Sequence, residues 1–313
     1  MEALHRVVYP PTDRYYYYRG GTVDKGSKVG NLLFSLACGW ILSLETVSQV
    51  SLLIQVQLFQ LIETSLWFSL FAALVSGLFT GLSYHLWAQH LTNLGDQLWK
   101  TKDGRLKTKI QPGKDPGGDL KREAVLFGNL NAFLVGVFGT GMFILHVRCY
   151  RWSSATIAYR GLLRFYLDCL LTFFWLDFTA YWMHRLLHTK SLYKHLHKWH
   201  HRYNVPTAHS AFASHPVDFL VFQAAGLGIL VFNVNVIAFL LVSVITAYLN
   251  VVKHAGIKFT GEYPWTPTPD FHDDHHSRFT ANFGFDLILW DYMFGTLRRK
   301  GKTYSETTFA DSW

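Results

Sequence analysis

The sequence predicts an all-α integral membrane protein with about four transmembrane helices, further re-entrant or hairpin segments, and a cytosolic cap of histidine-rich helices. Composition is the first reason: 50% of the 313 residues are hydrophobic and 16% are charged, against about 25% charged residues in soluble domains. The second reason is the alternation of long apolar segments with polar, basic loops. The third is a set of histidines that gather just beyond the apolar segments.

Charge and cysteine content argue against other classes of protein. The net charge of +8 is explained by membrane topology and attraction to anionic headgroups, because the basic residues border apolar segments and no nucleic-acid motif is recognisable. We therefore expect no nucleic-acid partner. The three cysteines (Cys38, Cys149 and Cys169) are scattered without a C-x-x-C pair, so neither a disulfide framework nor thiolate metal ligation is expected.

The first part of the chain divides into a tail and a membrane region. Residues 1–30 are a polar N-terminal tail, and residues 31–123 are expected to hold N-terminal membrane helices and a basic cytosolic linker. Residues 31–44 and 47–62 are short or interrupted by glutamines, which predicts a tilted or re-entrant pair. Residues 66–87 contain no Lys, Arg, Asp or Glu and predict a full span.

Loop charge sets the expected topology. The linker at residues 90–123 carries eight basic residues, which predicts a cytosolic location. Residues 124–147 then predict a second span, and residues 165–183 a segment that crosses back and delivers His184 to the cytosolic side. The intervening loop, residues 148–164, holds four arginines and has to be lumenal, in mild conflict with the charge rule.

A long apolar stretch follows. Residues 217–252 contain one charged residue, Asp218, and a possible turn at Asn233-Val-Asn235. This pattern predicts a helical hairpin that enters the membrane and returns to the same side. His254 and the last histidines would then face the cytosol with the earlier ones.

Three histidine groups carry the chemistry of the sequence. They read H-x-x-x-H at 184–188, H-x-x-H-H at 197–201 and H-x-x-H-H at 272–276. Helix positions i, i+3 and i+4 share a face, so each group presents its imidazoles in one direction. Neutral imidazole is a ligand for iron and zinc, and eight imidazoles exceed what one ion needs. Without metal, so many rings packed together would lose solvation and repel one another on protonation, which favours a two-metal site.

The order and spacing of these groups resemble the membrane fatty acid hydroxylase/sterol desaturase superfamily. The segments HRLLH, HKWHH and HDDHH match its motifs, and the flanking ASHPVDF and LWDYMFGT also look like family sequence. The resemblance covers roughly residues 165–300, whereas the first 120 residues carry little of it. It implies a fatty acid hydroxylase-like catalytic domain at residues 124–300, followed by a tail at 301–313.

The resemblance also implies a cofactor and a ligand set. Family members use two irons and O2, with electrons from NAD(P)H through cytochrome b5 or a reductase, here a separate protein; zinc could replace iron in a purified sample. A further histidine expected between the second and third groups is His254, whereas Asn250 stands where some members have another histidine. The implied metal ligands are His184, His188, His197, His200, His201, His254, His272, His275 and His276.

Four residues are candidates for supporting roles around these ligands. Asp177 precedes His184 by seven residues, close to two helical turns, and is expected to orient a ligand ring; a hydrated interfacial aspartate is the alternative. His209 and His215 are candidates for the pocket or for support of the ligands, and otherwise are interfacial residues. Asn250 would hold a water molecule or a ligand ring.

The resemblance implies oxidation of an unactivated C–H bond in a sterol or long-chain lipid at the endoplasmic reticulum, with the active site on the cytosolic side. Some segments look like C-4 methylsterol monooxygenases and others like sterol C-5 desaturases, so hydroxylation is favoured and desaturation is the alternative. The non-enzymatic alternative is a metal-binding membrane scaffold. A metal transporter fits less well, because the histidines lie beyond the spans. Sequence does not address the oligomeric state.

Overall fold

The computed structural model describes residues 65–98, 109–111, 113–149, 161–228, 232, 234–257 and 265–298. Helices dominate these residues, and their only β-type pairing is one isolated antiparallel bridge between Lys109 and Ile257. The all-α prediction is therefore confirmed. The predicted re-entrant pair at 31–44 and 47–62, and both predicted tails, lie outside the described residues.

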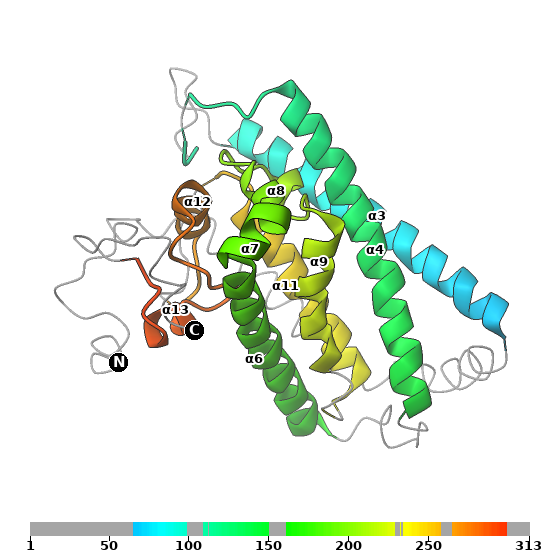
Figure 1. Ribbon diagram of the computed structural model, residues 1–313. Helices are drawn as coiled ribbons and strands as arrows, with labels where there is room; N and C mark the ends of the chain where they lie inside the picture. Colours follow the sequence, from blue (N-terminus) through cyan, green and yellow to red (C-terminus); the bar gives the residue numbers. More distant parts are fainter. Residues whose placement is uncertain are drawn as a thin grey trace.

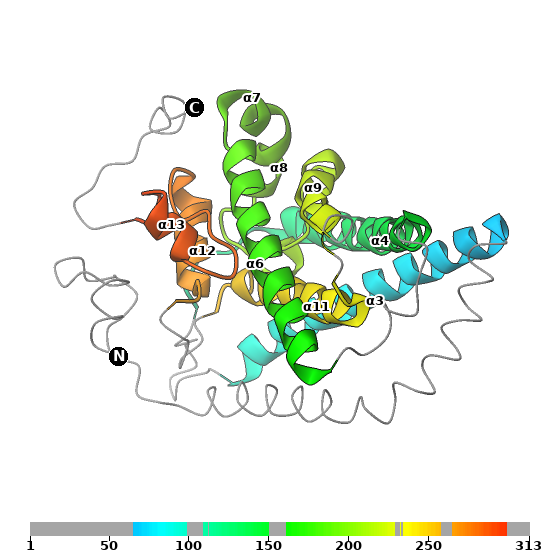
Figure 2. The same ribbon diagram turned by 90° about the horizontal axis from the view of Figure 1, so that it is seen from below.

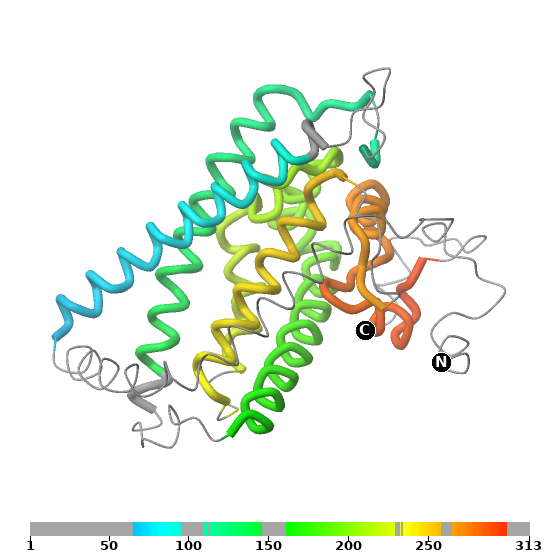
Figure 3. Tube along the Cα trace, turned by 180° about the vertical axis from the view of Figure 1, so that it is seen from behind, coloured from blue at the N-terminus to red at the C-terminus, as the bar shows by residue number. Residues whose placement is uncertain are grey.

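Two long helices form one side of the molecule. α3 (Leu66–Leu98) and α4 (Gly118–Cys149) lie side by side in Figures 1 and 3. Their close approach depends on glycine: a Cβ atom at Gly136 would lie 2.5 Å from the carbonyl oxygen of Ser76 and 2.7 Å from Cα of Gly77. Small residues at a helix crossing bring backbones into van der Waals contact, which is how helices associate in lipid.

The other helices stand between this pair and the C-terminal segment. α6 (Leu162–Leu187) packs along α11 (Val236–Lys253), and α9 (Pro216–Gln223) continues into the 3-10 turn η3 (Ala224–Leu227). α9 begins with Pro216 at its first position, and α11 begins where Asn235 Oδ1 accepts hydrogen bonds from the Ile237 and Ala238 amides. α9 and α11 thus occupy the two halves of the predicted hairpin, and Asn235 of the predicted turn is the N-cap of α11.

Three of the described helices are long and apolar enough to cross a membrane: Leu66–Leu94, Gly118–Leu145 and Val236–Lys253. Their exposed leucines, valines and phenylalanines suit contact with lipid. α6, predicted as a fourth span, is not among the three, and it carries Arg164 and Asp168 in its first turns. Asp168 is 3% exposed; its Oδ1 lies 2.9 Å from Arg164 Nε and its Oδ2 accepts from the Asn235 amide. The acid inside the predicted crossing is therefore paired and fastens α6 to the start of α11.

The cap consists of short elements. The chain continues from α6 through α7 (Lys190–Leu192), the π-helical turn η1 (Tyr193–His197) and α8 (Lys198–His201), and a 3-10 turn η2 (Ala208–Ser210) precedes α9. α12 (Pro269–Arg278) and α13 (Leu289–Met293) lie beside α6 on the side away from α4 (Figures 1 and 2). Segments distant in sequence therefore meet at the C-terminal end of α6.

Candidate metal centre

The histidines are placed by helix ends and one widened turn. His184 and His188 lie one turn apart at the end of α6, and His188 is its C-cap. After α7, the five residues Tyr193–His197 form the π-helical turn that ends at His197. π-Helical turns are rare and frequently found at functional sites, because the extra residue per turn re-aims the following side chains. α8, which carries His200 and His201, begins directly after this turn.

The nine histidines predicted as ligands come together in two groups, each with one nitrogen per ring within 4.8 Å of the others. We call them the five-histidine group and the four-histidine group. Eight of the rings are buried, and His188 is half-buried. The five-histidine group is His184, His188, His197, His201 and His275, and the four-histidine group is His200, His254, His272 and His276.

The four-histidine group converges through its Nε2 atoms. Nε2 of His254 lies 2.9 Å from that of His272 and 3.3 Å from those of His200 and His276. A neutral imidazole has only one N–H, so these contacts cannot all be good hydrogen bonds. Ligand nitrogens about 2.0–2.1 Å from a shared tetrahedral metal would lie roughly 3.3 Å from one another. The spacing fits a metal-binding arrangement.

The five-histidine group is equally compact. The ring centroids of His184 and His275 are 4.4 Å apart, and those of His188 and His197 are 4.7 Å apart. His188 and His201 bring their Nε2 atoms to 3.1 Å. Nε2 of His197 and Nε2 of His275 are buried without a hydrogen-bond partner among the described residues. Nitrogens so arranged are available to a metal.

Backbone carbonyls orient four of the rings. Each accepts a hydrogen bond from Nδ1, which fixes the tautomer and leaves Nε2 as the ligand atom. The pairs are His184 with Phe283 (2.9 Å), His200 with Ala213 (3.2 Å), His254 with Asn250 (2.8 Å) and His275 with Ala281 (2.7 Å).

A carboxylate orients a fifth ring. Nδ1 of His197 lies 3.1 Å from both carboxylate oxygens of Asp218, which is 0% exposed and comes from α9. Sequence reasoning did not single out this aspartate as part of the site. The signal was present, since Asp218 is the one charged residue of the apolar stretch at 217–252. A lone acid in such a stretch is expected to face the protein interior.

Burial and neighbouring rings keep five of the candidate ligand rings neutral at pH 7. Burial, followed by the neighbouring imidazole rings, lowers the pKa of His201, His272 and His276 well below the usual value. Burial likewise lowers the pKa of His200 to about 4 and that of His275 to about 3. Metal binding requires neutral imidazole, so these rings are in the binding form at pH 7.

Asp177 is placed differently from the prediction. It is 1% exposed, and its oxygens accept hydrogen bonds from the Asp286 amide (2.6 Å) and Trp290 Nε1 (2.7 Å) rather than from a ligand ring. The ring of His184 is held by a carbonyl instead. Asp286 in turn forms a buried ion pair with Lys253. The hydrogen bonds of Asp177 thus do not match the predicted role of orienting a ligand ring. Asp177 instead fastens α6 to the segment after α12.

The other three supporting candidates, Asn250, His215 and His209, have different places in the structure. Asn250 holds His254 with its backbone carbonyl, while its side-chain Nδ2 lies 3.5 Å from the Ala211 carbonyl oxygen. His215 caps α9 through its Nδ1, which accepts from the Val217 amide. His209 lies outside both histidine groups, with its ring centroid 5.4 Å from that of His85.

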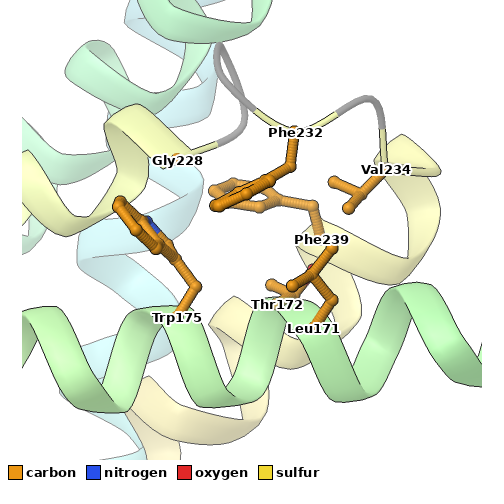
Figure 4. Close-up of a pocket in the computed structure, with 7 residues that line it drawn as sticks. All are labelled: Leu171, Thr172, Trp175, Gly228, Phe232, Val234 and Phe239. Carbon is orange, nitrogen blue, oxygen red and sulfur yellow. The ribbon is translucent and has the colours of Figure 1, made fainter.

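A small apolar pocket lies elsewhere, between α6 and the hairpin of α9 and α11 (Figure 4). It is small: its empty volume of about 190 Å³ includes open solvent. Thr172 in its wall precedes His184 by twelve residues, about 18 Å along a helix. The pocket is therefore apart from the histidine groups. Its lining residues are Leu171, Thr172, Trp175, Gly228, Phe232, Val234 and Phe239.

Comparison with known families agrees with this geometry. Residues 169–296 match the fatty acid hydroxylase family, and this segment contains both histidine groups and Asp218. The resemblance to the fatty acid hydroxylase/sterol desaturase superfamily that the three histidine motifs predicted is therefore confirmed for this segment. No solved structure matches the chain.

Curated relatives resemble the same part of the chain. The very-long-chain aldehyde decarbonylase GL1-11 of Oryza sativa is 33% identical over 38% of this chain and 48% of its own length. The Delta(7)-sterol 5(6)-desaturase ERG3A of Gibberella zeae is 35% identical over 39% of this chain and 35% of its own. A Dictyostelium discoideum protein with a methylsterol monooxygenase name is 31% identical over 44% and 51%. The chain thus spans about half or less of the length of these relatives.

Proposed function

We propose that this protein is an oxidoreductase of the membrane: an O2-dependent di-iron hydroxylase or monooxygenase that oxidises a C–H bond of a sterol or long-chain lipid. The observation that carries the proposal is the gathering of nine histidines, eight of them buried, into groups of five and four. A structural zinc ion is satisfied by four ligands in a closed site. Nine imidazole rings in two adjoining groups exceed that need and suit two catalytic metals.

The donor set fits iron. All nine candidate ligands are imidazoles, which suit iron and zinc alike, so zinc can occupy the groups in a purified sample. When bound, two irons supply activation of O2 and abstraction of hydrogen from an unactivated C–H bond. The residues of the chain hold the ligand rings, orient them and keep water away.

Aromatic side chains line the five-histidine group. Phe283 and Phe285 lie 5.5 and 5.4 Å from His184, measured between ring centroids, and Phe222 lies 5.7 Å from it. Phe222 lies in α9 and Phe283 follows α12, so side chains from two separate segments contact the ring of His184. Such a lining excludes water and lowers the local dielectric, which strengthens electrostatic interactions and prevents side reactions.

The relatives support a lipid substrate. Two of their names specify sterols and one a very-long-chain aldehyde, so a sterol or long-chain lipid is the common class. We favour an oxygen-inserting step like that of a methylsterol monooxygenase. The desaturase relative favours a second candidate, a reaction like that of a sterol C-5 desaturase. Both reactions begin with loss of one hydrogen, and they differ in what happens to the carbon afterwards.

The resemblance to the superfamily also supports a proposal for the location of the protein and for its supply of electrons. We place the protein in the endoplasmic reticulum membrane with the histidine cap facing the cytosol, where NAD(P)H supplies electrons through a separate cytochrome b5 or reductase. Lys190, Lys194 and Lys198 are exposed at intervals of four residues on the cap. This spacing gives a basic helix face that suits an acidic electron carrier or anionic headgroups.

A matched pair of histidine variants tests the proposal. The full chain is expressed in cells that lack their own copy of the protein. The protein is purified and its iron and zinc contents are measured, and the lipids of the same cells are profiled. His200→Ala is expected to lower metal content and abolish turnover, because it removes a ring of the four-histidine group. His195→Ala, an exposed histidine of the same helical segment, is the control and is expected to change neither.

The lipid profile separates the candidates. Accumulation of a 4-methylated sterol in cells lacking the protein would support the monooxygenase, and accumulation of a 5,6-saturated sterol would support the desaturase. Two metals per chain without any oxygen-dependent lipid change would favour the metal-binding scaffold. Full activity of His200→Ala would contradict the site itself.

A further inference from the structure

The two histidine groups differ in what lies behind their rings. His197, in the five-histidine group, directs Nδ1 to the two carboxylate oxygens of Asp218 at 3.1 Å. In the four-histidine group, His200 and His254 direct Nδ1 to backbone carbonyls. Across the described parts of the chain, His197 is the only one of the nine rings that pairs with a carboxylate. Among the described residues, a carboxyl group is therefore hydrogen-bonded to a ring of one group and to no ring of the other.

α9 is built to bring this carboxylate inward. Asp218 is 0% exposed, whereas its neighbours Val217 and Leu220 on the same helix are 49% and 40% exposed. Phe222, one turn after Asp218, lies 5.7 Å from His184 and 6.1 Å from His197 between ring centroids. The inward face of α9 thus contacts the five-histidine group at two positions one turn apart.

A carboxylate behind a ligand ring has a definite effect. It accepts the Nδ1–H bond, which turns Nε2 toward the metal, and it makes the ring a stronger donor. It also offsets part of the positive charge of the bound ion, which a neutral carbonyl does less well. Two cations in adjoining groups repel each other, so the group with the additional negative charge holds its ion more firmly.

We infer that Asp218 is a positioning residue that makes the five-histidine group the tighter of two unequal metal positions. The inference rests on the proposed function in one respect, that the chain holds two metal ions. Beyond that, it follows from the hydrogen bond between Asp218 and His197 and from the number of histidines in each group, five against four.

Asp177 supplies a matched control within the same domain. It is a buried carboxylate like Asp218, 1% exposed, but its partners are a backbone amide and the Trp290 indole instead of an imidazole. Asp177→Asn and Asp218→Asn therefore each remove one buried carboxyl group. Only the second removes it from behind a ligand ring.

The experiment measures iron per folded chain. The full-length protein in detergent is loaded anaerobically with ⁵⁷Fe(II) and dialysed against increasing concentrations of a chelator. We expect the wild type to hold two irons and to lose them in two steps. In Asp218→Asn one iron should bind about 10–100-fold more weakly, with one of two Mössbauer signals changed. Asp177→Asn should keep both steps and both signals, and Asp218→Glu should recover part of the lost affinity.

The outcomes separate this inference from the proposed function. A wild-type chain that does not hold two irons would overturn both. Two irons in the wild type and unchanged affinities in Asp218→Asn would overturn the inference alone. Equal loss of iron in Asp177→Asn and Asp218→Asn would also overturn it, because the loss of any buried carboxyl group, and not the contact with His197, would then be responsible.

A second measurement covers the case in which Asp218→Asn does not fold. The wild type is stripped by chelator to one iron per chain and compared with His272→Ala, which disrupts only the four-histidine group. The two samples should give the same Mössbauer signal, that of iron in the five-histidine group. Different signals would overturn the inference.

Discussion

Lys253 and Asp286 form an ion pair in which both side chains are buried, at 6% and 5% exposure. Lys253 is the last residue of α11 and directly precedes His254, while the Asp286 amide donates to Asp177 of α6. The pair therefore joins the helix that ends at one candidate ligand to the helix that carries two others.

Breaking this pair from one side is expected to be costly. Lys253→Met leaves Asp286 buried and unpaired, for which we expect a loss of about 3–5 kcal/mol in the free energy of unfolding. The double variant Lys253→Met/Asp286→Leu leaves no isolated charge and should recover much of the loss. Thermal unfolding in detergent measures both, and a double variant as unstable as the single one would contradict the explanation.

The crossing of α3 and α4 gives a second prediction. A methyl group at Gly136 would meet Ser76 and Gly77 backbone atoms at 2.5 and 2.7 Å, so the helices would have to move apart. We expect Gly136→Ala to cost about 1–3 kcal/mol, the usual cost of overpacking. Gly139→Ala is the control because nothing lies within 4 Å of its added methyl group. Equal melting temperatures for the two variants would argue against this crossing.

The buried ring of His209 predicts an effect of pH. Burial, followed by the nearby His85, lowers the pKa of His209 to about 4. In the unfolded chain the ring has a pKa of about 6.5, so between these values the unfolded state binds the proton and the folded state does not. The free energy of unfolding should therefore fall as the pH drops from about 6.5 towards 4.

Replacement of this residue isolates its share. His209→Gln cannot take up the proton, so its stability should fall less than that of the wild type between pH 7 and pH 5. Melting temperatures at the two pH values provide the comparison. Parallel losses in the two proteins would show that other groups are responsible.

Removal of metal should weaken the cap. A ligand at 1,000 times its dissociation constant stabilises the folded state by about 4 kcal/mol. We therefore expect the chelated protein to melt at a lower temperature, and readdition of ferrous iron to restore it. The variant His272→Ala should show a smaller response to chelation than His195→Ala, because it has lost part of the four-histidine group. Identical changes in melting temperature for the two variants would contradict the proposal that these histidines bind metal.

Much of the fold and of the candidate site could be predicted from the sequence. The hairpin of α9 and α11 was predicted from 36 residues with one charge and turn-forming residues near the middle, and Asn235 indeed caps α11. The apolar segments at 66–87 and 124–147 lie within α3 and α4. Residues 165–183 were also predicted to cross the membrane, yet α6 is not among the three helices that are long and apolar enough, and Asp168 and Asp177 lower its apolar character.

The spacing of the histidines alone determined which rings could act together, because i, i+3 and i+4 positions of a helix share a face. It could not determine how the rings divide. His200 and His201 are adjacent in sequence yet belong to different groups, since neighbouring helical side chains point in different directions. Asp218 stands 21 residues from His197, and the carbonyl that holds His184 is 99 residues away. Contacts of that kind depend on how separate segments pack, so only the tertiary structure decided which residue orients each ring.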